Sequence, residues 1–134
     1  MELTPPIQVV AAVIEREGRF LVAQRPAHKR HGGLWEFPGG KLKQGEDLFA
    51  AARRELAEEL GVEVQSLGPI EMSIADGASV FVISFARAEI MGEPTAHEHD
   101  ALAWVASTEL LTYALAPSDR RYATTVLVAG ACSQ

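Results

Sequence analysis

The segment from 46 to 60 most restricts how this chain can fold, because it predicts one amphipathic helix. Acidic Glu46 and Asp47 stand at its start, where the helix dipole is positive, and Gly61 follows as a stop signal. Apolar side chains recur at helical spacing through it, at Phe49, Ala52, Leu56 and Leu60. Such a stripe packs against another apolar surface, and we expect a β-sheet to supply it.

Segments with strand character lie on both sides of this helix. Strands are predicted over 7–14, 19–24, 62–74, 79–90 and 101–105. The first two are expected to form a β-hairpin around Gly18, and the Pro38-Gly39-Gly40 run is expected to be an irregular turn. Helices are predicted at about 108–115 and 119–131. This order predicts one α/β domain over residues 1–134, with a mixed sheet and helices on both faces.

Composition excludes several classes of function. The net charge of -6 makes a long nucleic-acid interface unexpected. The longest apolar runs fall short of the roughly 20 residues that span a bilayer, and no export signal opens the chain. Cys132 is the only cysteine, which excludes an internal disulfide, and it is expected to pack within the last helix. A cytoplasmic protein without a membrane partner is therefore expected.

Three glutamates of the predicted helix carry the chemical signal. Glu55, Glu58 and Glu59 stand at i, i+3 and i+4 and therefore share one helical face. Carboxylates at this spacing repel one another unless something offsets their charge. A hard divalent cation such as Mg²⁺, which binds carboxylates together with substrate phosphates, would do so. The alternative is a solvated acidic face without a metal.

These glutamates belong to a longer pattern that spans residues 40–62. Its fixed positions are Gly40, Glu46, Arg54, Glu55, Leu56, Glu58, Glu59, Gly61 and Val62. The pattern resembles the signature of the Nudix hydrolases. The run 33–41 is similar to the MutT branch, and residues 96–99, Trp104 and 115–119 are similar to bacterial CTP pyrophosphohydrolases, with Ser118 as a departure. The resemblance implies a Nudix-type α/β/α sandwich with a central mixed β-sheet.

The resemblance also implies roles for the acidic residues. Mg²⁺, or Mn²⁺ in its place, would be bound by Glu55, Glu58, Glu59, Glu98 and the Gly39 carbonyl. Arg54 would pair with Glu46 and orient the carboxylates. Glu58 and Glu98 are close alternatives for the general base.

Four further positions match substrate-binding residues of the family. Arg25 and Lys41 would contact phosphates, while Phe37 and Asp119 would hold the base. Three of them have a simpler interpretation: Arg25 as a surface charge, Phe37 as core, and Asp119 as the N-cap of the last helix. Trp35 is expected to pack, and His97 and His99 are expected to be surface residues.

The expected function is Mg²⁺-dependent hydrolysis of a nucleoside triphosphate to the monophosphate and pyrophosphate. A carboxylate at Asp119 accepts from the cytosine amino group, so CTP, dCTP and modified forms are expected first. The alternative substrate is 8-oxo-dGTP, and a nucleotide-sensing Nudix module without turnover is a third possibility. ADP-ribose and diadenosine polyphosphates are less well supported, since residues 76–78 lack the proline or tyrosine typical of those enzymes. A monomer or a homodimer is expected.

Overall fold

The computed structural model describes residues 5–76 and 80–128, so Cys132 lies outside the described part. Two four-stranded sheets form its centre. The strands are β1 Ile7–Val13, β2 Glu15–Arg16, β3 Arg19–Gln24, β4 Trp35–Glu36, β5 Gly39–Lys41, β6 Glu63–Asp76, β7 Phe81–Met91 and β8 Ala101–Ala106. The helical segments are α1 Leu48–Leu60, a 3₁₀ turn Leu110–Thr112, α2 Pro117–Tyr122 and a π-helical segment Ala123–Val128.

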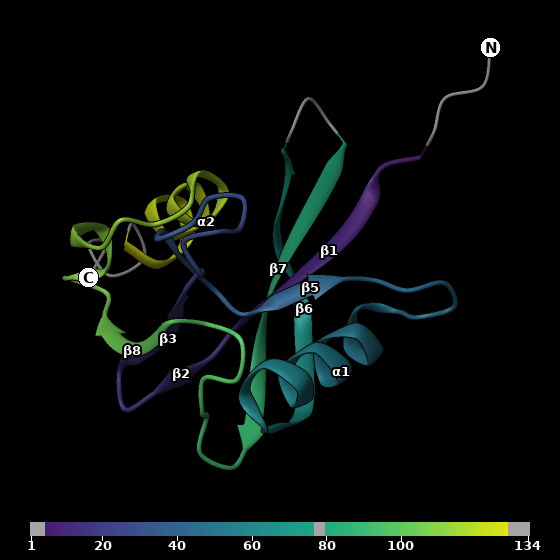
Figure 1. The fold of residues 1–134 in the computed structure, drawn as a ribbon, viewed down its shortest axis with the longest axis horizontal. Coiled ribbons are helices and arrows are strands. Elements are labelled where there is room, and N and C mark those ends of the chain that lie inside the picture. The colour runs from purple at the N-terminus through teal and green to yellow at the C-terminus, as the bar shows by residue number, and fades with distance from the viewer. Residues whose placement is uncertain (1–4, 77–79, 129–134) are drawn as a thin grey trace.

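The first sheet is mixed, as the sequence predicted. Its strand order is β5-β1-β7-β6, with β1 parallel to β7 and antiparallel to β5, and β6 antiparallel to β7. Strand β1 is central because its second half, from Val10 to Val13, is buried on both faces of the sheet. Figure 1 shows β1 and the long β7 running side by side through the middle of the molecule.

The predicted hairpin between 7–14 and 19–24 is wrong. Strand β3 lies in the second sheet, in which it pairs with β2, β4 and β8. The hairpin is only the short β2–β3 pair, which turns through Glu17 and Gly18 at φ values of 53° and 78°. Strand β1 instead obtains its partners from β5 and β7, because its apolar second half needs burial on both faces.

The prediction of an irregular turn at 38–40 is also wrong for its two glycines. Gly39 and Gly40 pair with Ala11 and Val10 as part of β5. A Cβ atom at Gly39 would lie 1.9 Å from the Val10 carbonyl oxygen, so the two strands approach closely only because this residue has no side chain.

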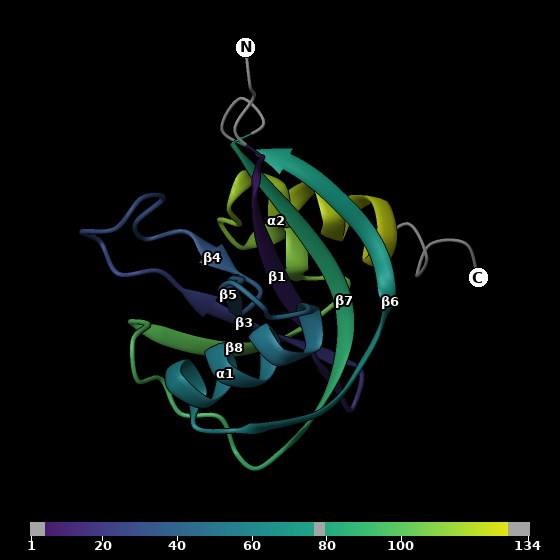
Figure 2. The same ribbon diagram turned by 90° about the vertical axis from the view of Figure 1, so that its right-hand side faces the viewer.

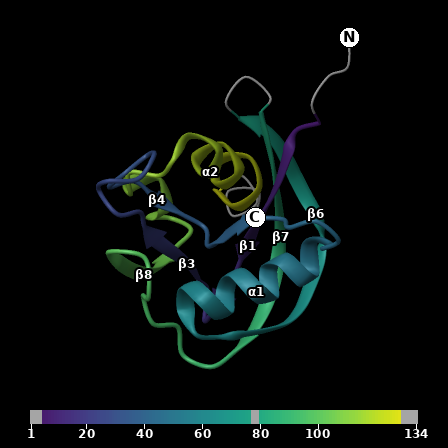
Figure 3. The same cartoon turned by 45° about the vertical axis from the view of Figure 1, so that its right-hand side comes forward.

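Helix α1 follows the prediction closely. Asp47 is its N-cap and accepts a hydrogen bond from the Ala50 amide at 2.8 Å, and Gly61 ends it in the left-handed conformation. The stripe formed by Ala52, Leu56 and Leu60 is buried, with Phe49 partly buried beside it. Figures 2 and 3 show α1 and α2 on opposite sides of the β-structure, which is the expected α/β/α arrangement.

The end of the described chain differs from the prediction. Only the 3₁₀ turn Leu110–Thr112 forms within 108–115, and Leu115 instead bridges to Trp35. The Arg120 guanidinium donates to the carbonyls of Leu111 and Tyr113, which holds this stretch in an irregular path. Helix α2 begins at Pro117, and its N-cap is Ala116. Asp119 is therefore not the cap.

Candidate active site

The three glutamates of α1 share a face but differ in solvent exposure. The Glu58 side chain is 52% exposed, whereas those of Glu55 and Glu59 are 18% and 7% exposed. The helix turns Glu59 toward the sheets and leaves Glu58 at the open edge. A solvated acidic face would leave all three in water, so the burial of Glu59 and the partial burial of Glu55 argue against that simpler interpretation.

Arg54 is the cation that organises this cluster. Its Nε and Nη2 donate to the two Glu46 oxygens at 2.7 and 2.8 Å, and its Nη1 donates to Glu55 at 2.8 Å. Nη2 also donates to the Lys41 carbonyl at 3.0 Å. These hydrogen bonds lower the pKa of Glu46 to about 2 and raise the pKa of Arg54. The structure thus contains the predicted Arg54–Glu46 pair.

Glu59 lacks such a partner. Its Oε1 is buried and has no hydrogen-bond partner among the described residues. Burial is the largest cause that raises the pKa of Glu59 to about 10, and the neighbouring Glu55, Glu36 and Glu98 carboxyl groups add to it. An acidic group in these surroundings carries its charge only when a cation is close.

The Glu55 carboxylate lies against strand β5. A Cβ atom at Gly40 would come within 2.4 Å of the Glu55 carboxyl carbon, so this strand position accepts only glycine without displacement. Gly40 also lines the cavity described below. The acidic cluster and the cavity therefore meet at this residue.

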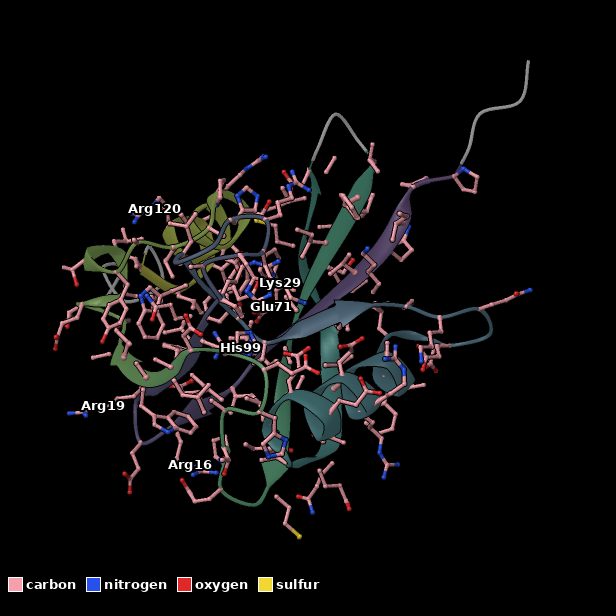
Figure 4. All side chains as sticks on the ribbon, viewed as in Figure 1. Arg16, Arg19, Lys29, Glu71, His99 and Arg120 are labelled. Atoms are coloured by element: carbon pink, nitrogen blue, oxygen red, sulfur yellow. The ribbon has the colours of Figure 1, made fainter. Side chains whose placement is uncertain are left out.

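Glu98 reaches the cluster from the loop between β7 and β8. The His97 amide donates to the Glu59 carbonyl at 2.9 Å, and the His97 ring contacts the Glu58 carbonyl at 3.1 Å, so this loop is fixed to the end of α1. Glu98 itself is exposed. His97 is exposed, as predicted, but the surface prediction for His99 is wrong because its side chain is only 6% exposed. Figure 4 shows His99 in the interior, whereas Arg19 extends outward.

A cavity of about 290 Å³ opens beside this cluster. Its lining comes from β1, β5, β7, the loop after β3 and the start of α2. Four predicted substrate residues lie in the lining together with the Gly39 backbone, namely Arg25, Phe37, Lys41 and Asp119. The structure thus brings these residues together, and it places the acidic side chains of α1 outside the cavity lining.

The cationic residues of the cavity have defined partners. Arg25 Nη1 donates to Glu36 at 2.9 Å, and its Nε donates to the Arg30 carbonyl at 2.6 Å. The Lys41 ammonium lies 5.4 Å from the centre of the Phe81 ring. Arg25 is therefore held at the cavity and is not a free surface charge.

Phe37 and Asp119 are buried residues of the cavity lining. Phe37 is buried and makes edge contacts with Phe85 and Tyr122, so it is a core residue that also forms cavity wall. Asp119 accepts a hydrogen bond from the Phe37 amide at 2.9 Å. Burial raises the pKa of Asp119 to about 8. Asp119 therefore lines the cavity and does not cap the helix, as its position in the sequence had suggested.

Sequence reasoning missed several residues of the site. Glu36, Arg30 and Phe81 all line the cavity, and His99 supports it from behind. Glu36 stands inside the run 33–41, whose resemblance to the MutT branch was a usable signal. Arg30 and Phe81 gave none, because only the fold places the loop after β3 next to the first residue of β7.

Comparisons with known proteins show the family of the chain. A family model described as NUDIX domain matches residues 4–126. The chain is 44% identical to the CTP pyrophosphohydrolase of Escherichia coli over 84% of this chain and 85% of the relative. It is 42% identical to the putative 8-oxo-dGTP diphosphatase 2 of Mycobacterium tuberculosis over 84% and 82% of the two chains.

A solved structure gives the same result for the fold. The crystal structure of the MutT NUDIX hydrolase from Burkholderia pseudomallei has a TM-score of 0.80 and 29% identity, covering 92% of this chain and 99% of the other. Because the family model matches nearly the whole described chain and two relatives exceed 40% identity, the chain belongs to the NUDIX family, in its MutT-like branch.

Proposed function

We propose that this protein is a Mg²⁺-dependent nucleoside triphosphate pyrophosphohydrolase with a preference for cytosine nucleotides. Water would attack the β-phosphorus, and the bond to the oxygen shared with the α-phosphate would break, giving the nucleoside monophosphate and pyrophosphate. The observation that carries the proposal is the position of Gly40. This residue lies against the Glu55 carboxylate of α1 and also lines the cavity that holds Arg25 and Lys41.

The residues present fit a divalent cation. The Oε1 of Glu59, buried and without a hydrogen-bond partner in the described part of the chain, is an oxygen donor of the kind that Mg²⁺ prefers, and Glu55, Glu58, Glu98 and the Gly39 carbonyl would complete the set. No three such side chains are gathered at ligand spacing within residues 5–76 and 80–128. The exposed Glu58 and Glu98 would therefore turn inward on binding. The cation would neutralise phosphate charge and lower the pKa of a bound water.

The chain's own groups would perform the remaining tasks. Arg25 and Lys41 would hold the phosphate chain, since guanidinium and ammonium groups bind phosphate oxygens. Arg54 keeps the Glu55 carboxylate in place through its 2.8 Å hydrogen bond. Glu58, the most exposed carboxylate of the helix cluster, would accept a proton from the attacking water, with Glu98 as the alternative base.

The buried part of the cavity lining, at Phe37 and Asp119, would select the base. Asp119 would accept a hydrogen bond from the exocyclic amino group of cytosine, while Phe37 forms part of the wall. The similarity to a CTP pyrophosphohydrolase supports this preference. The second candidate substrate is 8-oxo-dGTP, which is favoured by the similarity to a putative 8-oxo-dGTP diphosphatase. The proposal places the reaction in the cytoplasm, on a monomer or a homodimer.

A panel of nucleotides tests this proposal. Pyrophosphate release would be measured with Mg²⁺ for CTP, dCTP, 8-oxo-dGTP and the unmodified purine nucleotides. We expect turnover of cytosine nucleotides first, loss of turnover in excess EDTA, and recovery after Mg²⁺ is restored. Tight nucleotide binding without turnover of any member of the panel would instead support the sensor alternative.

Glu58→Gln tests the proposed general base. We expect kcat to fall by about two orders of magnitude, because general-base assistance typically contributes about 10²–10⁴ in rate. The exposed side chain should make the change harmless to folding, which a thermal melt would check. The matched variant Glu63→Gln, at an exposed position of β6, should keep full activity. A normal rate for Glu58→Gln would transfer the role to Glu98.

A further inference from the structure

His99 occupies a buried position between two carboxyl groups of the site. Its Nε2 lies 2.9 Å from Glu36 Oε2 and 3.9 Å from Glu59 Oε1. Its Nδ1 is buried without a hydrogen-bond partner among the described residues. A hydrogen on Nε2 therefore satisfies Glu36 and leaves Nδ1 as a bare acceptor, the less costly atom to leave unpaired.

The backbone on both sides of His99 fixes its ring. The His97 amide donates to the Glu59 carbonyl at 2.9 Å, and the Asp100 amide donates to the Gln24 carbonyl at 3.0 Å. The loop is thus attached to α1 on one side and to β3 on the other. The ring position follows from these two attachments.

The Glu36 carboxylate links His99 to Arg25. Its Oε1 accepts from Arg25 Nη1 at 2.9 Å, while its Oε2 faces His99. Arg25 and Glu36 line the cavity, but His99 does not. His99 therefore contacts the Glu36 carboxylate from outside the cavity lining, and the same carboxylate contacts the Arg25 guanidinium.

We propose that His99 is a positioning residue that fixes Glu36, and through Glu36 holds the Arg25 guanidinium in place for substrate. The inference rests on the proposed function, in which Arg25 contacts the nucleotide. An arginine side chain loses much rotational freedom when it is ordered. If the free protein already holds the guanidinium in place, this loss of side-chain entropy does not weaken substrate binding.

A double-mutant cycle of His99→Phe and Arg25→Gln tests this inference. KM and kcat for CTP, and the affinity for a nonhydrolysable CTP analogue, would be measured for the four proteins. We expect His99→Phe to weaken analogue binding and raise KM about fivefold in the otherwise natural chain, and to have almost no further effect once Arg25 is replaced. Equal losses in both backgrounds would overturn the proposal, because His99 would then act independently of Arg25.

Conservative variants separate positioning from simple packing. Gln brings an amide nitrogen close to the place of Nε2, whereas Asn brings one close to the place of Nδ1. We expect His99→Gln to retain the analogue affinity and His99→Asn to lose it, so the cycle remains readable if His99→Phe fails to fold. His99→Gln behaving no better than His99→Asn would contradict the proposal.

His97→Phe is the matched control on the same loop. It removes the contact with the Glu58 carbonyl but not the link to Glu36, so its effect should simply multiply with that of Arg25→Gln. Non-additivity of the same size here would overturn the specific assignment to His99. Analogue binding is read without turnover, so failure of the natural protein to hydrolyse any nucleotide would count against the proposed function alone.

Discussion

Asp119 and Glu46 are carboxyl groups whose pKa values move in opposite directions because their surroundings differ. Glu46 receives two hydrogen bonds from Arg54, which hold its pKa near 2. Asp119 is buried, and the loss of water outweighs the single hydrogen bond from the Phe37 amide, so its pKa rises from 3.8 to about 8. A carboxyl group is thus stabilised as an anion at Glu46 and in its protonated form at Asp119.

Asp119→Asn should change the pH dependence of stability. A carboxyl group with a raised pKa in the folded state stabilises the fold fully below pH 4, and this contribution is lost as the pH rises toward 8. Asn cannot ionise, so the variant should lack this loss. Relative to the variant, the natural protein should lose on the order of 5 kcal/mol between pH 4 and pH 8, since the pKa lies near 8 instead of 3.8 and each pKa unit corresponds to about 1.4 kcal/mol.

Chemical denaturation at several pH values would measure this difference. Glu63→Gln, which removes an exposed carboxylate, serves as the control and should follow the natural protein. Parallel stability curves for Asp119→Asn and the natural protein would show that Asp119 is ionised throughout this pH range.

Arg54→Gln should damage the site without unfolding the chain. It removes the donors that hold Glu46 and Glu55, and loss of such supporting contacts typically costs about 10- to 100-fold in metal affinity or activity. The neighbouring Arg53→Gln is the matched control, because Arg53 is exposed and lies over the Phe49 ring. Steady-state rates at varied Mg²⁺ would compare them, and equal rates would remove Arg54 from the site.

The contact between β5 and α1 brings the metal-binding helix to the cavity. Gly40 lies in a strand that pairs with β1, and the Glu55 carboxylate occupies the space in which a side chain at Gly40 would stand. The buried side of α1 sets the distance between the two elements, since Ala51, Ala52 and Leu56 are fully buried. Small residues on both elements therefore determine how close the carboxylate comes to the cavity.

Gly40→Ala should displace Glu55. The added methyl group would lie 2.4 Å from the carboxyl carbon, so the carboxylate must turn away and Mn²⁺ affinity should fall about tenfold. Manganese binding followed by electron paramagnetic resonance measures this directly. Gly68→Ala is the control, since a methyl group there meets its nearest atom at 3.6 Å. Unchanged Mn²⁺ affinity in Gly40→Ala would exclude Glu55 as a ligand.

An aromatic cluster holds the whole molecule together behind the cavity. The Phe85 ring of β7 stacks on Tyr122 of α2 at 4.5 Å, and Phe37 meets both rings edge to face. The Tyr122 hydroxyl donates to Glu71 of β6. The buried cavity lining at Phe37 is thus built on contacts among the first sheet, α2 and the loop before β5. None of the helices in the described residues is long and apolar enough to cross a membrane.

Phe85→Ala should destabilise the whole fold. Removal of a fully buried phenylalanine side chain costs about 3 to 5 kcal/mol, because it leaves a cavity in addition to the lost apolar burial. Urea denaturation monitored by two probes would measure the loss. Ile70→Ala, at a position 51% exposed, should change the unfolding free energy little. A similar small loss for Phe85→Ala would mean that the cluster is not central to stability.

Local rules were enough to predict α1, its end at Gly61 and the acidic face, because helix periodicity and stop signals act within a few residues, but they placed Asp47 inside the helix and not at its N-cap. They also placed β6, β7 and β8 closely. They failed for the partners of β1 and for Gly39 and Gly40, since strand pairing depends on segments distant in sequence. They failed again at 108–115, where the Arg120 side chain replaces helical hydrogen bonds.

The sequence by itself determined the acidic helix, because a fixed spacing on one helix sets which carboxylates stand together, and its resemblance to the Nudix signature indicated the family and the residues expected to bind metal and nucleotide. Only the tertiary structure decided which of them are buried, that Asp119 lines a cavity instead of capping a helix, and that His99 contacts Glu36. Burial and long-range contacts depend on how distant segments pack, and no local pattern in the chain specifies that packing.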